Sequence, residues 1–162
     1  MKTPKPMEEK VALQRVAALC SARECCVSEV EEKLARWGQS SEAQARIIAY
    51  LIREGYIDEA RFCRAYALDK MRYNHWGRVK IAQSLRLLGV NGADSEAALR
   101  ELPEDEYAEL LRKTAATKLP SIKASSAYER NGKLIRFLLG RGFEMSLIRQ
   151  CLNGTDDFDD NA

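Results

Sequence analysis

The chain has 162 residues, of which 46% are apolar and 31% are charged, with a formal net charge of +2. That apolar share can fill an ordinary core, so the composition excludes an intrinsically disordered chain. No apolar stretch approaches the ~20 residues that cross a bilayer. The five cysteines show no CxxC spacing and the start of the chain is too polar for a signal peptide, so we predict a cytoplasmic protein.

The first predicted module covers residues 1–57 and contains three helices. The first helix is expected over Glu8–Ser21, and the second ends at Gly38. A glycine at the end of a helical pattern is typical of a C-cap with positive φ. The third helix is expected to begin near Ser41, with Gln44 completing a capping box. Its core face is predicted to contain Ala45, Ile48 and Ile52.

Two further three-helix modules are predicted over residues 58–102 and 103–152. They are expected to begin at Asp58, a good N-cap residue, and at Pro103, a good first-turn residue. The last helix of the second module is expected to begin near Asp94. Each module buries little surface alone, so stacking of neighbours is expected to complete the core.

One pattern recurs in all three modules: an apolar residue, a second four residues later, and a glycine four residues after that. The copies are Val30, Leu34 and Gly38; Ile81, Leu85 and Gly89; and Leu134, Leu138 and Gly142. This spacing places the apolar pair on one helix face, and no segment alternates with period two. We therefore predict an all-α fold, an elongated, curved array of three tandem three-helix modules. Residues 153–162 are predicted to form a disordered acidic tail.

Few residues of the chain suit catalysis. The single histidine, His75, lies in a predicted turn, and no phosphate-cradling or nucleophile-elbow motif occurs. The tail lacks the glycine and distal glutamate of a calcium loop. Cys25 and Cys26 lie near Arg23, which would favour a thiolate, but no base or resolving motif accompanies them. We predict no catalytic residue, metal or cofactor; a thiol enzyme would instead lose activity when Cys25 and Cys26 become serine.

Basic residues gather in two blocks that flank an acidic one. Residues 61–90 contain seven Lys/Arg against one Asp/Glu, residues 91–110 one against seven, and residues 111–141 eight against one. Basic side chains beside helix N-termini suit phosphate contacts. Side chains that project to solvent near such helix starts are expected to bind nucleic acid or a nucleoprotein filament. The predicted set is Arg72, Arg78, Lys80, Arg86, Lys113, Lys118, Lys123, Arg130, Lys133, Arg136 and Arg141, with Tyr73, Trp76 and Tyr128 as base-stacking residues.

The order and spacing of three stretches resemble the regulatory protein RecX family, modulators of the bacterial RecA recombinase. The stretches are GYIDEARF at 55–62 followed by Ala65-Tyr66; GRVKI at 77–81 with Leu85 and Gly89-Val90; and KLIRFLL at 133–139 followed by Arg141-Gly142-Phe143. Weaker similarity lies at 20–24 and 34–38, so the resemblance covers about residues 11–152. Lys80 stands where the family often has arginine, and Cys63 where it usually has alanine.

The resemblance implies three tandem three-helix modules and binding in the groove of a RecA–single-stranded-DNA filament. It further implies repression of strand exchange, ATP hydrolysis and co-protease activity. We therefore predict a non-enzymatic, monomeric regulator whose partners are the RecA filament and single-stranded DNA, with double-stranded DNA as a further partner and no membrane. A helix-turn-helix regulator would instead prefer particular duplex sequences. A helical adaptor that binds only proteins would show no DNA affinity even at low salt.

Overall fold

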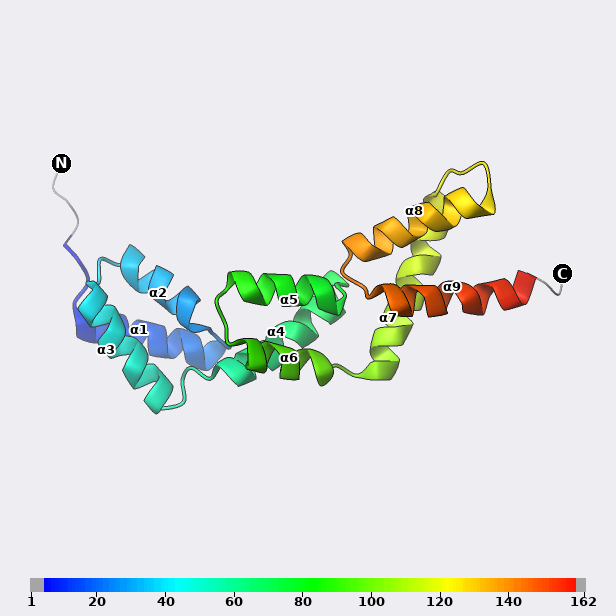
Figure 1. Ribbon diagram of the computed structural model, residues 1–162. Coiled ribbons are helices and arrows are strands. Elements are labelled where there is room, and N and C mark those ends of the chain that lie inside the picture. The colour runs from blue at the N-terminus through cyan, green and yellow to red at the C-terminus, as the bar shows by residue number, and fades with distance from the viewer. Residues whose placement is uncertain (1–4, 160–162) are drawn as a thin grey trace. The chain divides into compact units, whose positions relative to one another are not determined.

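The computed structural model describes residues 5–159, which form nine α-helices and one short 3-10 helix without a strand (Figure 1). The helices are α1 Glu9–Ala22, α2 Val27–Arg36, α3 Ser41–Arg53, α4 Glu59–Asn74, α5 Arg78–Leu87, α6 Gly92–Arg100, α7 Glu104–Lys118, η1 Leu119–Ser121, α8 Ala127–Gly140 and α9 Met145–Asp159. The prediction of an all-α chain of helical triplets is confirmed. None of these helices is long and apolar enough to cross a membrane.

The three glycine turns end α2, α5 and α8 as predicted. Gly38, Gly89 and Gly142 have φ angles of 81°, 73° and 95°. In each turn the residue after the glycine donates its N–H to the carbonyl oxygen five residues earlier, which is the Schellman pattern. The acceptors are the carbonyl oxygens of Leu34, Leu85 and Leu138, at 3.0, 3.5 and 3.2 Å. These leucines are also fully buried, so each one packs the core and closes its helix.

Helix α3 begins at Ser41 as expected, but its N-cap is Ser40. The Ser40 hydroxyl oxygen accepts from the Ala43 N–H at 3.1 Å, whereas the Gln44 amide donates to the Gln39 carbonyl at 2.9 Å. The predicted capping box of Ser41 and Gln44 is therefore wrong. The buried residues are Ala43, Ile47, Ile48 and Leu51, whereas Ala45 and Ile52 are exposed. Because nearly every residue from 45 to 52 is apolar, periodicity alone does not select the buried face.

Other helix starts agree with the sequence more closely. The Asp58 carboxylate accepts from the Arg61 N–H at 3.0 Å, which confirms Asp58 as a cap. Pro103 lies one position before the first turn of α7 and is its N-cap. Helix α6 is capped by Asn91, whose side-chain oxygen accepts from the Ala93 N–H at 2.8 Å, so the expected start near Asp94 is wrong. Helix α9 continues to Asp159, beyond the end expected at residue 152, and residues 160–162 of the predicted tail lie outside the described residues.

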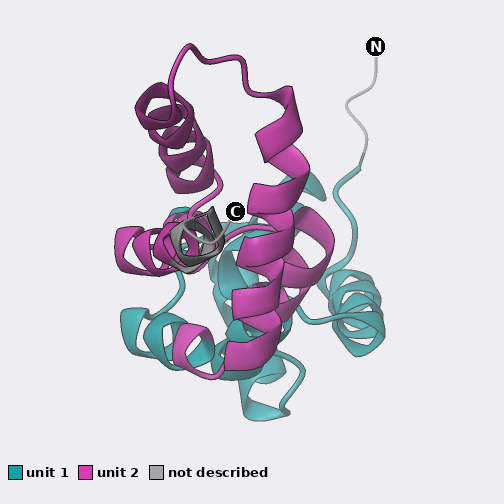
Figure 2. Ribbon diagram, turned by 90° about the vertical axis from the view of Figure 1, so that its right-hand side faces the viewer, with its two compact units in different colours: residues 1–65, 85–98 teal, residues 66–84, 99–162 magenta. Residues whose placement is uncertain are grey.

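The residues group into two compact units (Figure 2). Unit 1 consists of Met1–Ala65 and Leu85–Ala98, and unit 2 of Tyr66–Ser84 and Leu99–Ala162. Residues of the second predicted module thus occur in both units. Unit 1 has a core cluster drawn from α1, α2, α3 and the turns beside them. Its buried members are Ala12, Val16, Cys20, Cys25, Val30, Leu34, Ile47, Ile48, Leu51 and Ile57.

In unit 2 the start of α5 lies against the turn between α8 and α9. The Gly77 N–H donates to the Arg141 carbonyl at 2.8 Å, and the Val79 N–H donates to the Gly142 carbonyl at 2.9 Å. A Cβ on Gly77 would lie 2.3 Å from the Gly142 carbonyl carbon, and one on Gly142 would lie 2.4 Å from the Lys80 Cβ. The two segments therefore meet backbone to backbone, at a distance that only glycine permits.

Substitution of Gly77 by alanine should lower the free energy of unfolding by about 1–3 kcal/mol, because the new methyl group overlaps rigid backbone. The matched control is Gly132→Ala in the middle of α8, where a Cβ meets nothing within 4 Å. That change should raise stability by about 0.5–1 kcal/mol through lower chain entropy in the unfolded state. Urea unfolding followed by circular dichroism measures both. Equal stability of Gly77→Ala and the parent protein would contradict the backbone contact.

Candidate nucleic-acid interface

Three amides at the start of α5 are engaged inside unit 2. The Gly77 and Val79 N–H groups donate to the α8–α9 turn, and the Arg78 N–H donates to the Tyr107 hydroxyl at 3.0 Å. A helix start binds an anion only through amides that have no other acceptor. These three amides already have acceptors, and a phosphate contact at the start of α5 remains a prediction.

Arg78 lies within a cluster of side chains, which we call the Arg78 clasp: Arg78, Glu104, Tyr107 and Glu144. Its guanidinium forms ion pairs with Glu104 and Glu144, both at 3.0 Å, and Nε donates to the Leu99 carbonyl at 3.1 Å. The guanidinium also lies 4.0 Å from the centroid of the Tyr107 ring. Only 17% of the Arg78 side chain is exposed, so the prediction that it projects to solvent is wrong.

Tyr107 is the aromatic residue of the Arg78 clasp. Its hydroxyl donates to the Glu144 carboxylate, and its ring packs on Phe143 with centroids 5.6 Å apart. Burial raises the pKa of the Tyr107 phenol, and the hydrogen bond to Glu144 raises it further. The phenol therefore stays protonated at neutral pH and keeps its donor role.

Two other predicted arginines also contact partners within unit 2. Arg72 binds the Glu106 carboxylate through two nitrogens, at 2.8 and 3.0 Å, and the hydrogen bonding lowers the pKa of Glu106. Arg141 donates from Nη2 to the Asn74 carbonyl at 2.6 Å and to the His75 carbonyl at 3.3 Å. These contacts hold the α4–α5 turn, and a role of either arginine in binding remains a prediction.

Three lysines of unit 2 lie over aromatic rings rather than beside carboxylates. The ammonium nitrogens of Lys70 and Lys80 lie 5.1 and 4.8 Å from the centroid of the Trp76 ring. That of Lys118 lies 4.8 Å from the Phe137 centroid. Sequence reasoning missed Lys70, because it meets Trp76 across the end of α4, where helical spacing no longer applies.

The remaining predicted cations differ in how far they are already paired. Lys113 and Lys133 each face a glutamate four residues earlier, at 4.0 and 3.3 Å. Exposed pairs of this kind are weak and are lost easily to a stronger anion. Arg130 is half-buried, and its Nε has no hydrogen-bond partner. Within the predicted set, three exposed cations have no ion pair with any other described residue: Arg86, Lys123 and Arg136.

The three predicted stacking residues differ in exposure. Tyr73 is 78% exposed and Tyr128 is 90% exposed, so both rings are accessible. Trp76 is half-buried under its two lysines. A single-stranded base stacks on an open ring face, so the tyrosines meet that requirement more fully than the tryptophan.

The cysteines of the first module are buried. Cys25 and Cys26 are inaccessible, and burial raises the pKa of the Cys26 thiol. Burial also raises the pKa of Cys20 to about 12. The Cys20 and Cys26 thiols therefore form little thiolate at neutral pH and react slowly. Over the part of the chain that the structure describes, no cluster of three or more histidine, cysteine or acidic residues could hold a metal ion.

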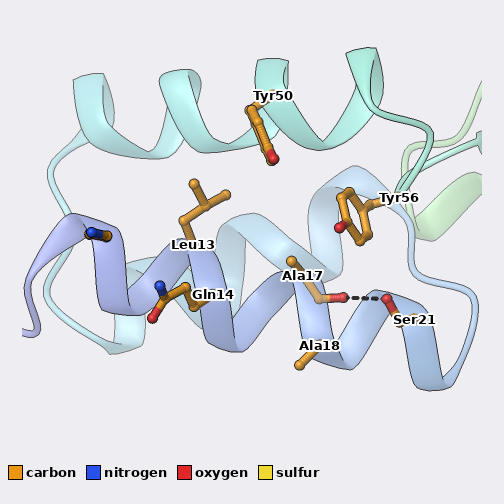
Figure 3. A pocket seen from close by; sticks show the side chains of 8 residues that line it. Leu13, Gln14, Ala17, Ala18, Ser21, Tyr50 and Tyr56 are labelled. Carbon is orange, nitrogen blue, oxygen red and sulfur yellow. Dashed lines mark hydrogen bonds between the residues drawn. The ribbon is translucent and has the colours of Figure 1, made fainter.

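A depression of about 460 Å³ lies between α1 and α3 in unit 1 (Figure 3). Its walls are Leu13, the small residues Ala17 and Ala18, and the tyrosines Tyr50 and Tyr56. The two tyrosine rings stack with centroids 6.4 Å apart. Lys10 is the one charged residue in the lining, so the depression lacks the converging polar groups of a catalytic site.

Two family models match the chain. The model for the second three-helix domain of RecX matches residues 58–99, and that for the third matches residues 104–152. The regulatory protein RecX of Prosthecochloris aestuarii is 32% identical over 146 residues, which cover 90% of this chain and 94% of that protein. The chain belongs to the regulatory protein RecX family. The resemblance found in the sequence is thus confirmed.

Further RecX proteins are similar in sequence and in fold. That of Pelodictyon phaeoclathratiforme is 33% identical over 135 residues, covering 80% of this chain and 82% of the relative. The crystal structure of RecX from Lactobacillus salivarius superposes with a TM-score of 0.80 at 20% identity, over 91% of this chain and 96% of that one. At that identity the superposition shows a shared RecX fold.

Replacement of Arg78 by methionine should destabilise the RecX-family chain by about 3–5 kcal/mol, because it leaves Glu144 partly buried without its cation. Arg72→Met is the matched control: it removes an ion pair at the surface and should leave the unfolding midpoint nearly unchanged. Thermal unfolding of the two variants and the parent protein measures the difference. Similar midpoints for both variants would show that the Arg78 clasp is not a stabilising cluster.

In the native protein, Cys25 and Cys26 should react slowly with a chromogenic disulfide reagent, because both thiols are inaccessible. Cys151, which is half-buried, should react first. A Cys151→Ser variant should therefore lose the fastest phase, whereas urea should expose all the thiols together. Fast labelling of Cys25 or Cys26 under native conditions would instead favour the thiol-enzyme alternative.

Proposed function

We propose that this RecX-family protein binds in the groove of a RecA–single-stranded-DNA filament and represses its recombinase, ATPase and co-protease activities without catalysing a reaction. The proposal is supported by membership of a family whose members are named as regulators. One observation supports it most directly. Exposed cations remain without acidic partners although the chain as a whole is nearly neutral, and Lys123 and Arg136 are the clearest cases.

Ion pairing separates the basic residues into two groups. Arg72 and Arg78 already bind glutamates and would have to break those pairs to reach a filament. Lys80 and Lys118 lie on aromatic rings, and Lys123 and Arg136 face solvent. Lys80, Lys118, Lys123 and Arg136 can bind phosphate or carboxylate without breaking an ion pair. Their contacts with DNA release counterions, so binding should weaken as salt rises.

Reversal of charge at Lys123 and Arg136 should raise the concentration needed for half-repression of RecA ATPase by about tenfold, through the lost ionic contacts. The double variant Lys123→Glu/Arg136→Glu should keep the helical content of the parent protein, since neither side chain is buried. ATP hydrolysis and strand exchange by RecA on single-stranded DNA are titrated with each protein at fixed salt.

The matched control reverses two exposed arginines of unit 1, in the variant Arg15→Glu/Arg36→Glu. This control changes the net charge equally and should repress like the parent protein. Repression by Lys123→Glu/Arg136→Glu at the parent concentration would overturn the assignment of these cations. Absence of repression by the parent protein at any concentration would overturn the proposed function itself.

A further inference from the structure

Four residues at the junction of α4 and α5 combine charge with exposed aromatic surface: Lys70, Tyr73, Trp76 and Lys80. Lys70 and Tyr73 are neighbours on α4, because residues three apart share a side of a helix. Lys70 and Lys80 converge on the two sides of the turn, since both ammonium groups lie about 5 Å from the Trp76 ring centroid. All four belong to unit 2.

The glutamates of unit 2 that lie near this junction are already paired. Glu106 is bound by Arg72, and Glu104 and Glu144 are bound by Arg78. Asp69 acts on Arg72, whose pKa it helps to raise, and no ion pair joins it to either lysine. The arginines thus neutralise these three glutamates, and neither lysine has an ion pair with a described residue.

We propose that Lys70, Tyr73, Trp76 and Lys80 form a contact site for an unpaired stretch of nucleic acid. The two ammonium groups bind phosphates of the strand, and the Tyr73 ring stacks on a base. Trp76 positions the lysines through its ring. This inference rests on the proposed function in taking a nucleic acid as the partner, and it names the strand form and the residues that the strand meets.

The exposure of Tyr73 favours an unpaired strand over a duplex. Bases in a duplex are stacked on one another, so a protein ring reaches a base face only where the strand is single. Tyr73 is 78% exposed and lies three residues from Lys70, so one strand can meet both ring and ammonium.

The two tryptophans of the sequence make the site measurable. In a Trp37→Phe background, Trp76 is the one remaining tryptophan and reports on its own surroundings. Titration with a thymidine oligonucleotide, without RecA, should change its fluorescence in a saturable manner. Lys70→Gln/Lys80→Gln should reduce the slope of log affinity against log salt by about 1.4, the value for two phosphates on a single strand.

Tyr73 is tested by a pair of variants in the same background. Tyr73→Ala should weaken oligonucleotide binding by about tenfold or more, and Tyr73→Phe should bind like the parent, because stacking needs the ring and not the hydroxyl. The charge control is Arg15→Gln/Arg36→Gln in unit 1, which should keep the parent salt slope. Circular dichroism checks that each variant is folded; Tyr73, Arg15 and Arg36 are exposed, whereas Lys70 and Lys80 are half-buried.

Three results would overturn the site: parental binding by Tyr73→Ala, an unchanged salt slope for Lys70→Gln/Lys80→Gln, or displacement by a duplex as effective as by the single strand. Displacement by polyglutamate at the same charge concentration would also overturn it, in favour of a general anion surface. Because RecA is absent, this test can fail while repression of RecA persists. Conversely, oligonucleotide binding through Tyr73 without repression of RecA would leave the site standing and remove the proposed function.

Discussion

A buried leucine and a left-handed glycine end the middle helix of every triplet, and the packing of the chain depends on this pair. The leucine side chain lies in the core, and its carbonyl oxygen accepts the N–H that follows the glycine. Loss of the turn would leave a helix end with unpaired carbonyls and move the next helix away from the core. The spacing of leucine and glycine thus links local backbone conformation to the burial of each triplet.

In unit 2 the distribution of charge follows from the same packing. The turn at Gly142 brings Glu144 to the start of α5, where the Arg78 guanidinium meets it together with Glu104. Burial makes this arginine a structural residue, because a partly buried cation requires close partners. The lysines of the same segment have longer aliphatic stems and lie on aromatic rings, with their ammonium groups left for an external anion. Arginine and lysine therefore serve different roles here, although their formal charge is the same.

Patterns confined to one helix predicted this fold well. The glycine turns, the cap at Asp58 and the all-helical class depend on contacts within a few residues, which spacing encodes. The buried face of α3 was not predictable, because apolar residues surround that helix. Arg78 was assigned to solvent because it lies off the face of Ile81; its partners Glu104 and Glu144 are 26 and 66 residues away. Tertiary contacts at that separation leave no mark in local periodicity.

The close contact between Gly77 and Gly142 is possible because neither residue has a side chain. Both hydrogen bonds across it join main-chain atoms, which every residue except proline provides. Flanking side chains can therefore change without altering the joint, provided that both glycines remain. A search of a sequence for complementary side chains would therefore miss this junction. Its sequence signal is a glycine just before α5 together with a glycine just after α8.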